Sequence, residues 1–314
     1  MIAAAVLMTA ALTLATTGPY WLDALARRVA SSLALTAWIS SVAAVFVLLA
    51  AALVVLLWPD HAPAEGLVEL AVSCASSLLH TARPWVGEAA ALTSAALAAG
   101  AAVRLTRSAC SQRRARSLVR ERHRDLLSIV ARAGTGPERV LWLDHPLPLA
   151  YSVSGRPGFI VATEGLREHL DHDQQDAVLA HERAHLHGRH HALVAAAETL
   201  AAAFPRIPLF GAAPGAIRVL VEHAADRSAA DATSAAAVSS ALATVSGAES
   251  IRPSWALGLM SETTRDRIRR LDGSITHTTS GAHAAVAVLP VLALAAAALT
   301  LSTFSALLCL ILQS

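Results

Sequence analysis

The sequence contains no lysine, so all 25 of the basic side chains counted as lysine or arginine are arginines. Charged residues make up only 15% of the chain, against about 25% in typical soluble proteins. Aromatic residues are also few, at 4%. The three cysteines, Cys74, Cys110 and Cys309, lie far apart and lack zinc-ligand spacing. These shortages argue against an ordinary soluble protein, a disulfide framework and a cysteine-based zinc site.

Alanine, leucine and valine dominate what is present: hydrophobic residues reach 55% and the mean hydropathy is +0.51. This mix suits helices packed closely in lipid better than a β-sandwich. The first apolar run could be a signal peptide, but no basic residue precedes it and the next arginine is Arg27, which favours a membrane helix. We therefore predict three transmembrane helices in residues 1–103, at about 2–17, 33–58 and 85–103, and a fourth in 284–314.

Arginine placement predicts how these helices are oriented. Arg27 and Arg28 lie between the first two apolar runs, and a dense arginine run from Arg104 to Arg124 follows the third. By the positive-inside rule, the first loop and residues 104–283 are cytoplasmic, and both termini lie outside the plasma membrane. Because the arginine run directly follows a membrane helix, we expect it to contact anionic lipid head groups and not nucleic acid.

Residues 104–283 are long enough for a domain of their own. A helix is predicted over Ser117–Ala131, and a strand over Val140–Leu143. Two further β-prone runs, Leu149–Val153 and Phe159–Ala162, flank a turn rich in glycine and proline, which predicts a hairpin. The rest is helical in character. The predicted fold class is an α-helical integral membrane protein with a cytoplasmic α+β domain.

One predicted helix has clear boundary signals. Asp171 or Asp173 could cap its start, and Gly188 could end it after about His187. The apolar stretch that follows, Ala192–Phe210, is expected to be a buried hairpin or a helix at the membrane interface, because a full span would separate the two halves of the site described next.

That helix carries the pattern His-Glu-x-x-His from His181 to His185. Histidines four residues apart share one face of a helix, as the capture of one zinc ion requires. Glu182 is rotated away from that face by about 100°, so it can act as a general base on water without being a ligand. The alternative is that the pattern arises by chance in a histidine-rich helix. We interpret His187, His190 and His191 as residues that face the surface or the lipid head groups, and not as ligands.

A third zinc ligand is expected from a second helix, Ala216–Ala232. Glu222 and Asp226 are four residues apart there and are surrounded by alanines, which suit close helix packing better than a solvated acidic face. We predict that Glu222 is the ligand and that Asp226 accepts the second N–H of a ligand histidine. His223 is a competing ligand, but it points away from the Glu222 face.

These residues resemble the M56 family of membrane zinc metallopeptidases and, more distantly, the M48 family. The resemblance spans about Val140 to Leu271, and its pieces are His181–His185 and Glu222–Asp226, the upstream stretches Leu149–Ser152, Phe159–Thr163, Gly165–Leu166 and Gln175–Ala180, and the basic Arg265–Leu271.

The resemblance implies a gluzincin-type domain with one Zn²⁺ per chain, held by two histidines and a glutamate. It also implies that a peptide substrate adds as a β-strand along Ala150, Tyr151 and Ser152. Antibiotic-sensing relatives carry a penicillin-binding sensor domain after the last span, and we expect none here.

The predicted function is that of a membrane-bound endopeptidase in regulatory signalling, acting on a cytoplasmic or membrane-proximal protein such as a transcriptional repressor. The alternative is a non-catalytic signalling or scaffold protein with a structural metal site. The group that stabilises the transition state stays open, within Arg252–His277.

Overall fold

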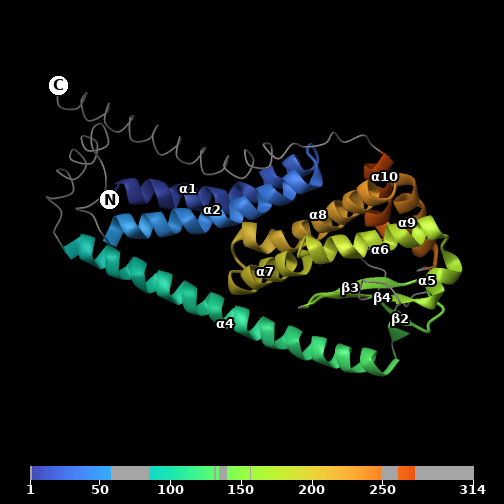
Figure 1. Cartoon of the computed structure of the whole chain (residues 1–314). Coiled ribbons are helices and arrows are strands. Elements are labelled where there is room, and N and C mark those ends of the chain that lie inside the picture. The colour runs from blue at the N-terminus through green and yellow to red at the C-terminus, as the bar shows by residue number, and fades with distance from the viewer. Residues whose placement is uncertain are drawn as a thin grey trace.

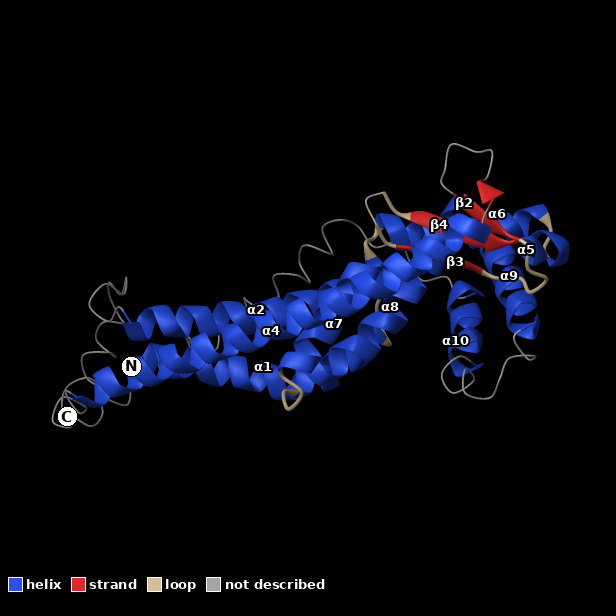
Figure 2. Cartoon of the chain, turned by 90° about the horizontal axis from the view of Figure 1, so that it is seen from below, coloured by secondary structure: helices blue, strands red, loops and turns tan. Residues whose placement is uncertain are grey.

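The structure is a computed structural model, and it describes residues 2–57, 85–130, 132–133, 140–155, 157–248 and 261–272. These residues are mostly helical. The two N-terminal helices lie at one end of the molecule and a small sheet with its neighbouring helices lies at the other, while α4 (Trp85–Val130) runs along the length between these ends (Figure 1). Colouring by secondary structure shows that the strands lie together at that second end (Figure 2). An α-helical protein with a small sheet is thus confirmed.

Helices α1 (Ile2–Ala26) and α2 (Ser31–Leu57) form a hairpin. Their contact is made by small buried residues such as Ala15 and Ala34, together with Trp38, which is fully buried. Of the helices in the described ranges, α2 alone is long and apolar enough to cross a membrane. The predicted spans 2–17 and 33–58 fall largely on α1 and α2. The predicted span in 284–314 lies outside the described residues, so a multi-pass arrangement stays a prediction.

Helix α4 (Trp85–Val130) is continuous over 46 residues. The separate helix predicted from Ser117 is wrong in its start, because residues 101–130 contain no glycine or proline and arginine is a good helix former. One face of α4 contacts α7 (His190–Ala203). Arg116 Nη2 lies 2.7 Å from Glu198 Oε2, and Arg218 pairs with the other Glu198 oxygen. Arg116 therefore pairs with a protein carboxylate, and the lipid contact expected for the arginine run stays a prediction.

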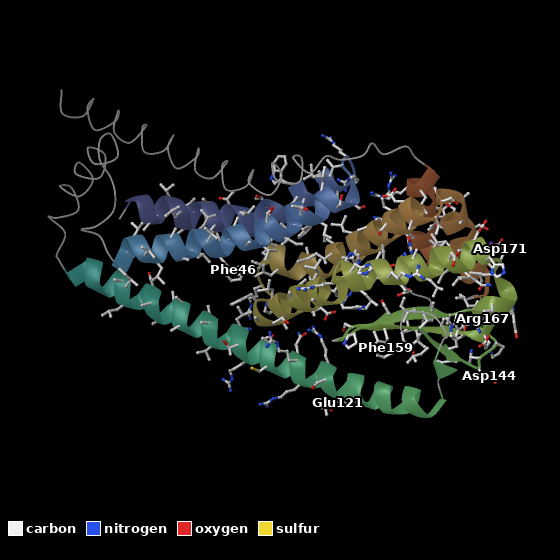
Figure 3. The ribbon with its side chains drawn as sticks, in the orientation of Figure 1. Phe46, Glu121, Asp144, Phe159, Arg167 and Asp171 are labelled. Atoms are coloured by element: carbon white, nitrogen blue, oxygen red, sulfur yellow. The ribbon has the colours of Figure 1, made fainter. Side chains whose placement is uncertain are left out.

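Helices α7 (His190–Ala203) and α8 (Pro208–Ala232) form a second hairpin. Its turn packs against α2, where the rings of Phe46 and Phe210 stack with centroids 5.5 Å apart (Figure 3). Leu209 beside Phe210 is fully buried. The stretch predicted as a buried hairpin or a helix at the membrane interface is thus a helical hairpin whose turn is buried at Leu209 and Phe210.

The sheet has the strand order β1-β2-β4-β3, with β1 (Arg132–Ala133), β2 (Val140–Leu143), β3 (Ala150–Val153) and β4 (Phe159–Thr163). Strands β3 and β4 are antiparallel, with Ala150 opposite Ala162, so the predicted hairpin is confirmed. Strand β2 runs parallel to β4, and β3 lies at an edge. Sequence reasoning missed the two-residue β1, which is too short to show periodicity.

Helix α5 (Glu164–His169) follows β4 directly and packs closely on the loop after β2. A Cβ at Gly165 would lie 2.1 Å from the carbonyl oxygen of Pro146, so this approach requires glycine. The guanidinium of Arg167 stacks 3.5 Å from the ring centroid of Trp142 in β2 (Figure 3). The strand end and α5 are thereby fixed to each other.

Helix α6 (His172–His187) lies between the sheet and helices α8 and α9 (Ala235–Ala248), and α10 (Ser261–Asp272) packs on α8 and α9. The predicted ends of α6 are confirmed. Asp171 caps the first turn in a capping box with Gln174, and Gly188 is the C-cap. Small buried residues on α6, such as Ala177 and Ala180, let its neighbours approach closely. This close packing brings the polar faces of α6 and α8 together.

Candidate metal centre

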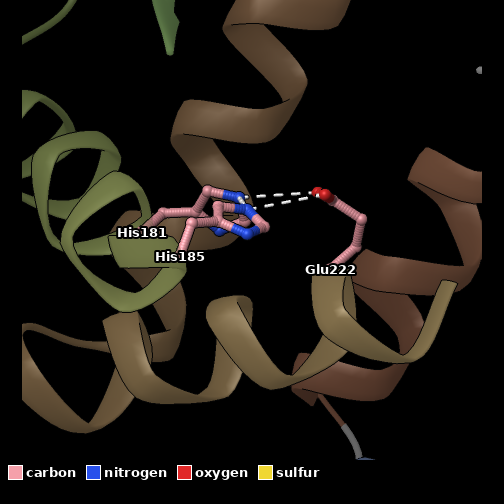
Figure 4. Close-up of side chains that lie close together, drawn as sticks. All are labelled: His181, His185 and Glu222. Atoms are coloured by element: carbon pink, nitrogen blue, oxygen red, sulfur yellow. Dashed lines mark hydrogen bonds and ion pairs between the residues drawn. The ribbon is translucent and has the colours of Figure 1, made fainter. Parts of the chain in front are cut away.

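Three side chains from α6 and α8 converge at this contact (Figure 4). The Nε2 atoms of His181 and His185 are 3.0 Å apart. Glu222 Oε2 lies 3.5 Å from His181 Nε2, and its Oε1 lies 3.5 Å from His185 Nε2. The two imidazoles share one face of α6, as the four-residue spacing requires, and the carboxylate reaches them from α8.

The spacing of these donor atoms fits a zinc ion. Ligand atoms roughly 2.0–2.2 Å from zinc in a tetrahedral arrangement lie about 3.4 Å from one another. The observed separations of 3.0, 3.5 and 3.5 Å are close to that value. Two imidazoles and one carboxylate leave a fourth position, which is the donor set of a catalytic and not a structural zinc site. The Glu222 side chain remains 40% exposed, so the cluster can be reached from solvent.

Asp226 lies behind His181, one turn after Glu222 on α8. Its Oδ1 is 3.0 Å from His181 Nδ1, and its side chain is only 3% exposed. Burial by itself lowers the pKa of His181, but the hydrogen bonds to Asp226 and Glu222 raise that pKa to about 9. A carboxylate on Nδ1 also fixes the ring so that Nε2 faces the other donors.

Arg267 on α10 holds this carboxylate from the other side. Its Nε and Nη2 donate to the two oxygens of Asp226 at 2.7 and 2.6 Å, and its Nη1 lies 3.4 Å from Glu222 Oε2. Burial alone raises the pKa of Asp226, but Arg267 and His181 lower it to about 2. Burial likewise opposes the charge on Glu222, whose pKa His181 and Arg267 nevertheless lower to about 2. Sequence reasoning placed Arg267 in a basic helix and missed this contact.

The other ligand histidine has a different neighbour. His185 Nδ1 lies 3.0 Å from Nδ1 of His190, which is 7% exposed. Burial and the charge of His181 lower the pKa of His185 to about 3, and burial lowers that of His190. The interpretation of His190 as a surface residue is wrong, because the chain reverses after α6 and returns this ring to the site. His187 and His191 are exposed.

His223, the competing ligand, is not part of the cluster. It is buried on another face of α8, where it lines a cavity of about 280 Å³ with Trp38 and Arg270. Its Nδ1 has no hydrogen-bond partner among the described residues. Burial, followed by the charge of Arg270, lowers the pKa of His223 to about 4.

Glu182 follows His181 on α6 and is half-buried. The charge of Glu182 influences Arg267. Burial by itself lowers the pKa of Arg267, but the three carboxylates of Asp226, Glu222 and Glu182 together raise that pKa above its usual value. The guanidinium of Arg267 thus contacts Asp226 and Glu222 and also interacts electrostatically with Glu182.

The residues expected to bind substrate lie on the edge strand β3. Ser152 is buried, and its Oγ lies 3.1 Å from Nε2 of His191 at the start of α7. The ring of His191 is 6.0 Å from that of His185, centroid to centroid. Ala150 and Tyr151 are half-buried, and burial raises the pKa of the Tyr151 hydroxyl. Strand β3 thus packs against α6, the helix that carries His181 and His185.

The fold and the site together define a helical protein with a small sheet and a cluster of two histidines and a glutamate that could hold a metal ion. Residues 114–269 match the family model described as Peptidase family M48, and this stretch holds all the donor groups named above. The match supports the M48 peptidase family, whose members are zinc-dependent. It does not confirm the resemblance to the M56 family. No solved structure matches the chain.

Proposed function

We propose that this protein is a membrane-bound, zinc-dependent endopeptidase in which His181, His185 and Glu222 hold the metal. The observation that carries the proposal is the convergence of two imidazoles and one carboxylate at 3.0–3.5 Å, with a glutamate directly after the first histidine. When bound there, zinc would polarise the scissile carbonyl and make water more acidic.

In this proposal Glu182 is the general base. Its carboxylate takes the proton of the attacking water and delivers it to the leaving amine. Asp226 keeps His181 in the tautomer that presents Nε2, and Arg267 keeps Asp226 charged and fixed. Arg267 also approaches Glu222 to 3.4 Å, so it limits where that carboxylate can turn.

We propose that the substrate adds as a further strand along β3, at Ala150, Tyr151 and Ser152. Two observations support this position: β3 is last in the strand order of the described residues, and the contact from Ser152 to His191 ties it to the start of α7 beside His185. A strand at the end of a sheet can accept an extended peptide as the next strand. Such recognition reads the backbone, which suits a protein substrate.

We also propose a membrane-anchored arrangement in which residues 104–283 form the catalytic domain and face the cytoplasm. Helix α2 supports the anchor. The exposed Arg27 and Arg28 lie in the turn between α1 and α2, and the preceding Asp23 and Ala26 line one cavity with His223. The arginine-bearing turn is therefore on the side of the catalytic helices, as the positive-inside rule requires. A cytoplasmic regulator, such as a transcriptional repressor, is the substrate we propose.

The test is Glu182→Gln in the full chain, purified in a neutral detergent. The variant should retain zinc, measured by elemental analysis after dialysis, and lose hydrolysis of fluorescently labelled casein by at least 100-fold. Glu168→Gln, the same change on the exposed end of α5, is the matched control and should behave as the parent.

Two results would contradict the proposal. Casein hydrolysis retained by Glu182→Gln excludes this residue as the base. A parent chain that binds zinc but cleaves nothing, and in which His185→Ala prevents folding, favours the alternative of a structural metal site.

A further inference from the structure

The second nitrogen of His185 has an unusual partner. His185 Nδ1 lies 3.0 Å from Nδ1 of His190, and the rings meet edge to face at 87° with centroids 4.9 Å apart. Both residues are buried, at 8% and 7% exposure. A buried polar atom needs a hydrogen-bond partner, and each of these nitrogens supplies one to the other.

The backbone between the two helices is shaped to allow this contact. Helix α6 ends at His187, and α7 begins at His190. Between them Arg189 adopts the left-handed conformation, with φ 50° and ψ 35°, and it is the sole non-glycine residue with positive φ in the described ranges. Such a residue is uncommon, and it turns the chain sharply here. The ring of His190 is thereby returned towards the preceding turn of α6.

Gly188 provides the space for that ring. A Cβ at this position would lie 2.3 Å from His190 Nε2 and 2.6 Å from its Cδ2. Gly188 has an ordinary helical φ of −73°, so the backbone itself does not require glycine. The absence of a side chain serves the packing of His190.

The positions of the two His185 nitrogens decide where its proton lies. Nε2 faces His181 and Glu222, so it must be free of hydrogen to act as a donor to a metal. The proton of the neutral ring is then on Nδ1, which donates to His190 Nδ1. His190 consequently carries its own proton on Nε2.

We propose that His190 is the positioning residue of the metal ligand His185, fixing its tautomer and ring orientation through a hydrogen bond between the two Nδ1 atoms. This inference rests on the proposed zinc site. It gives the two histidine ligands different supports: a carboxylate held by arginine for His181, and a neutral imidazole for His185. The neutral partner orients the ring without adding a second negative charge.

Neighbouring histidines do not replace His190 in this role. His187 is exposed at the end of α6, and the Nε2 of the exposed His191 is engaged by Ser152 at 3.1 Å. Loss of His190 therefore leaves the Nδ1–H of His185 buried and without an acceptor, and the ring gains freedom to rotate.

The test uses the full chain in detergent, with His190→Phe, His190→Asn and the matched control His187→Phe. The zinc dissociation constant is measured by competition with a chromogenic chelator, and the visible spectrum is recorded with Co²⁺ in place of zinc. His190→Phe should weaken zinc binding about 10- to 100-fold and shift the cobalt bands. His190→Asn, which can accept a hydrogen bond, should recover part of the affinity. His187→Phe should match the parent.

Gly188→Ala provides a second route to the same contact, because it displaces the His190 ring without removing a polar group. It should weaken zinc binding in the same direction. If His190→Phe and Gly188→Ala both bind zinc with parental affinity and an unchanged cobalt spectrum, the inference is wrong. If His190→Phe binds no zinc at all, with its helical circular dichroism intact, His190 is a ligand, which also overturns it.

These results are separable from the proposed function. A parent chain that binds zinc but has no peptidase activity contradicts the enzyme, while the dependence of zinc binding on His190 can still be measured. A parent chain with peptidase activity whose His190→Phe and Gly188→Ala variants both keep the parental zinc affinity and cobalt spectrum contradicts this inference alone.

Discussion

Oδ1 of Asp226 lies 3.0 Å from Nδ1 of His181. The same carboxylate accepts two hydrogen bonds from Arg267 at 2.6 and 2.7 Å. The side chains of Asp226 and Arg267 are 3% and 12% exposed, so the ion pair is nearly removed from water. Helices α8, α10 and α6 are joined by this chain of contacts, which links the stability of the fold to the orientation of a metal ligand.

Replacing Arg267 should therefore affect stability and zinc binding together. In Arg267→Met the Asp226 carboxylate keeps its burial but loses its charged partner, which should lower the free energy of unfolding by roughly 3–5 kcal/mol. The zinc dissociation constant should rise, because Asp226 no longer has a fixed orientation. Denaturant unfolding in detergent and chelator competition measure the two effects.

Two further variants serve as comparisons in this experiment. Arg267→Lys should fall between the parent and Arg267→Met, since an ammonium cannot bind both carboxylate oxygens in the same planar geometry. Arg265→Met removes an exposed arginine from the same helix and should change little. Equal destabilisation by Arg265→Met and Arg267→Met would mean that general charge, not the pair with Asp226, matters.

Zinc affinity should increase with pH in the neutral range. With the pKa of His181 raised to about 9 and that of His185 lowered to about 3, the metal-free site carries one proton, on His181, near pH 7. Zinc must displace that proton, so the association constant should rise about tenfold per pH unit between pH 7 and 8 and level off above about 9. Calorimetry in two buffers of different ionisation enthalpy should detect one proton released per zinc at pH 7.

Asp226→Asn is the control for this pH dependence. Its amide cannot raise the pKa of His181 by charge, so less than one proton should be released at pH 7 and the slope should flatten. Release of a full proton by Asp226→Asn would show that another group is the source.

Local signals explain why the sequence was sufficient for some elements. Asp171 caps the start of α6, and Gly188, which has no side chain, stands at its end. The glycine-rich turn predicts the hairpin of β3 and β4. The predicted helix start at Ser117 has no such signal within α4, whose helix continues through its arginines because no glycine or proline interrupts it there.

The supporting groups of the candidate site were harder to predict, since they depend on tertiary contacts. Arg267 is four residues before Leu271, which packs against the core, so it lies on the inward face of α10. An arginine on the inward face of a helix indicates a buried acidic partner, and this was the signal in the sequence that could have predicted the contact of Arg267. His190 depends on the left-handed turn at Arg189, and the usual assumption that a histidine-rich helix end is solvated gave the wrong result.

The cap of α6 gives a prediction that is independent of metal. Asp171 accepts a hydrogen bond from the Gln174 N–H at 2.8 Å, while the side chain of Gln174 accepts one from the Asp171 N–H at 3.0 Å. Asp171→Ala should lower the free energy of unfolding by about 1 kcal/mol. Asp173→Ala removes an acidic residue from the same first turn without removing the cap, so its effect should be a few tenths of a kcal/mol. Thermal unfolding of the metal-free chain compares them; equal effects would assign the stabilisation to charge alone.

His223 distinguishes the two ligands that the sequence offered on α8. Because its buried Nδ1 has no partner within the described part of the chain, His223→Leu removes an unsatisfied polar atom there and should leave stability at pH 7.5 equal or higher. Zinc binding should persist in His223→Leu and be lost in Glu222→Leu. Loss of zinc in His223→Leu, with Glu222→Leu still binding it, would reverse the assignment.

The same variant has a defined acid response. The folded-state pKa of His223 is about 4, below the value near 6.5 of an unfolded histidine, so the unfolded chain binds more protons between these values. His223 in the parent therefore contributes a loss of stability as pH falls from about 6.5 to 4. The leucine variant lacks that contribution, and its unfolding temperature should fall less over this range. A parallel decline in both proteins would show that His223 titrates alike in the folded and unfolded states.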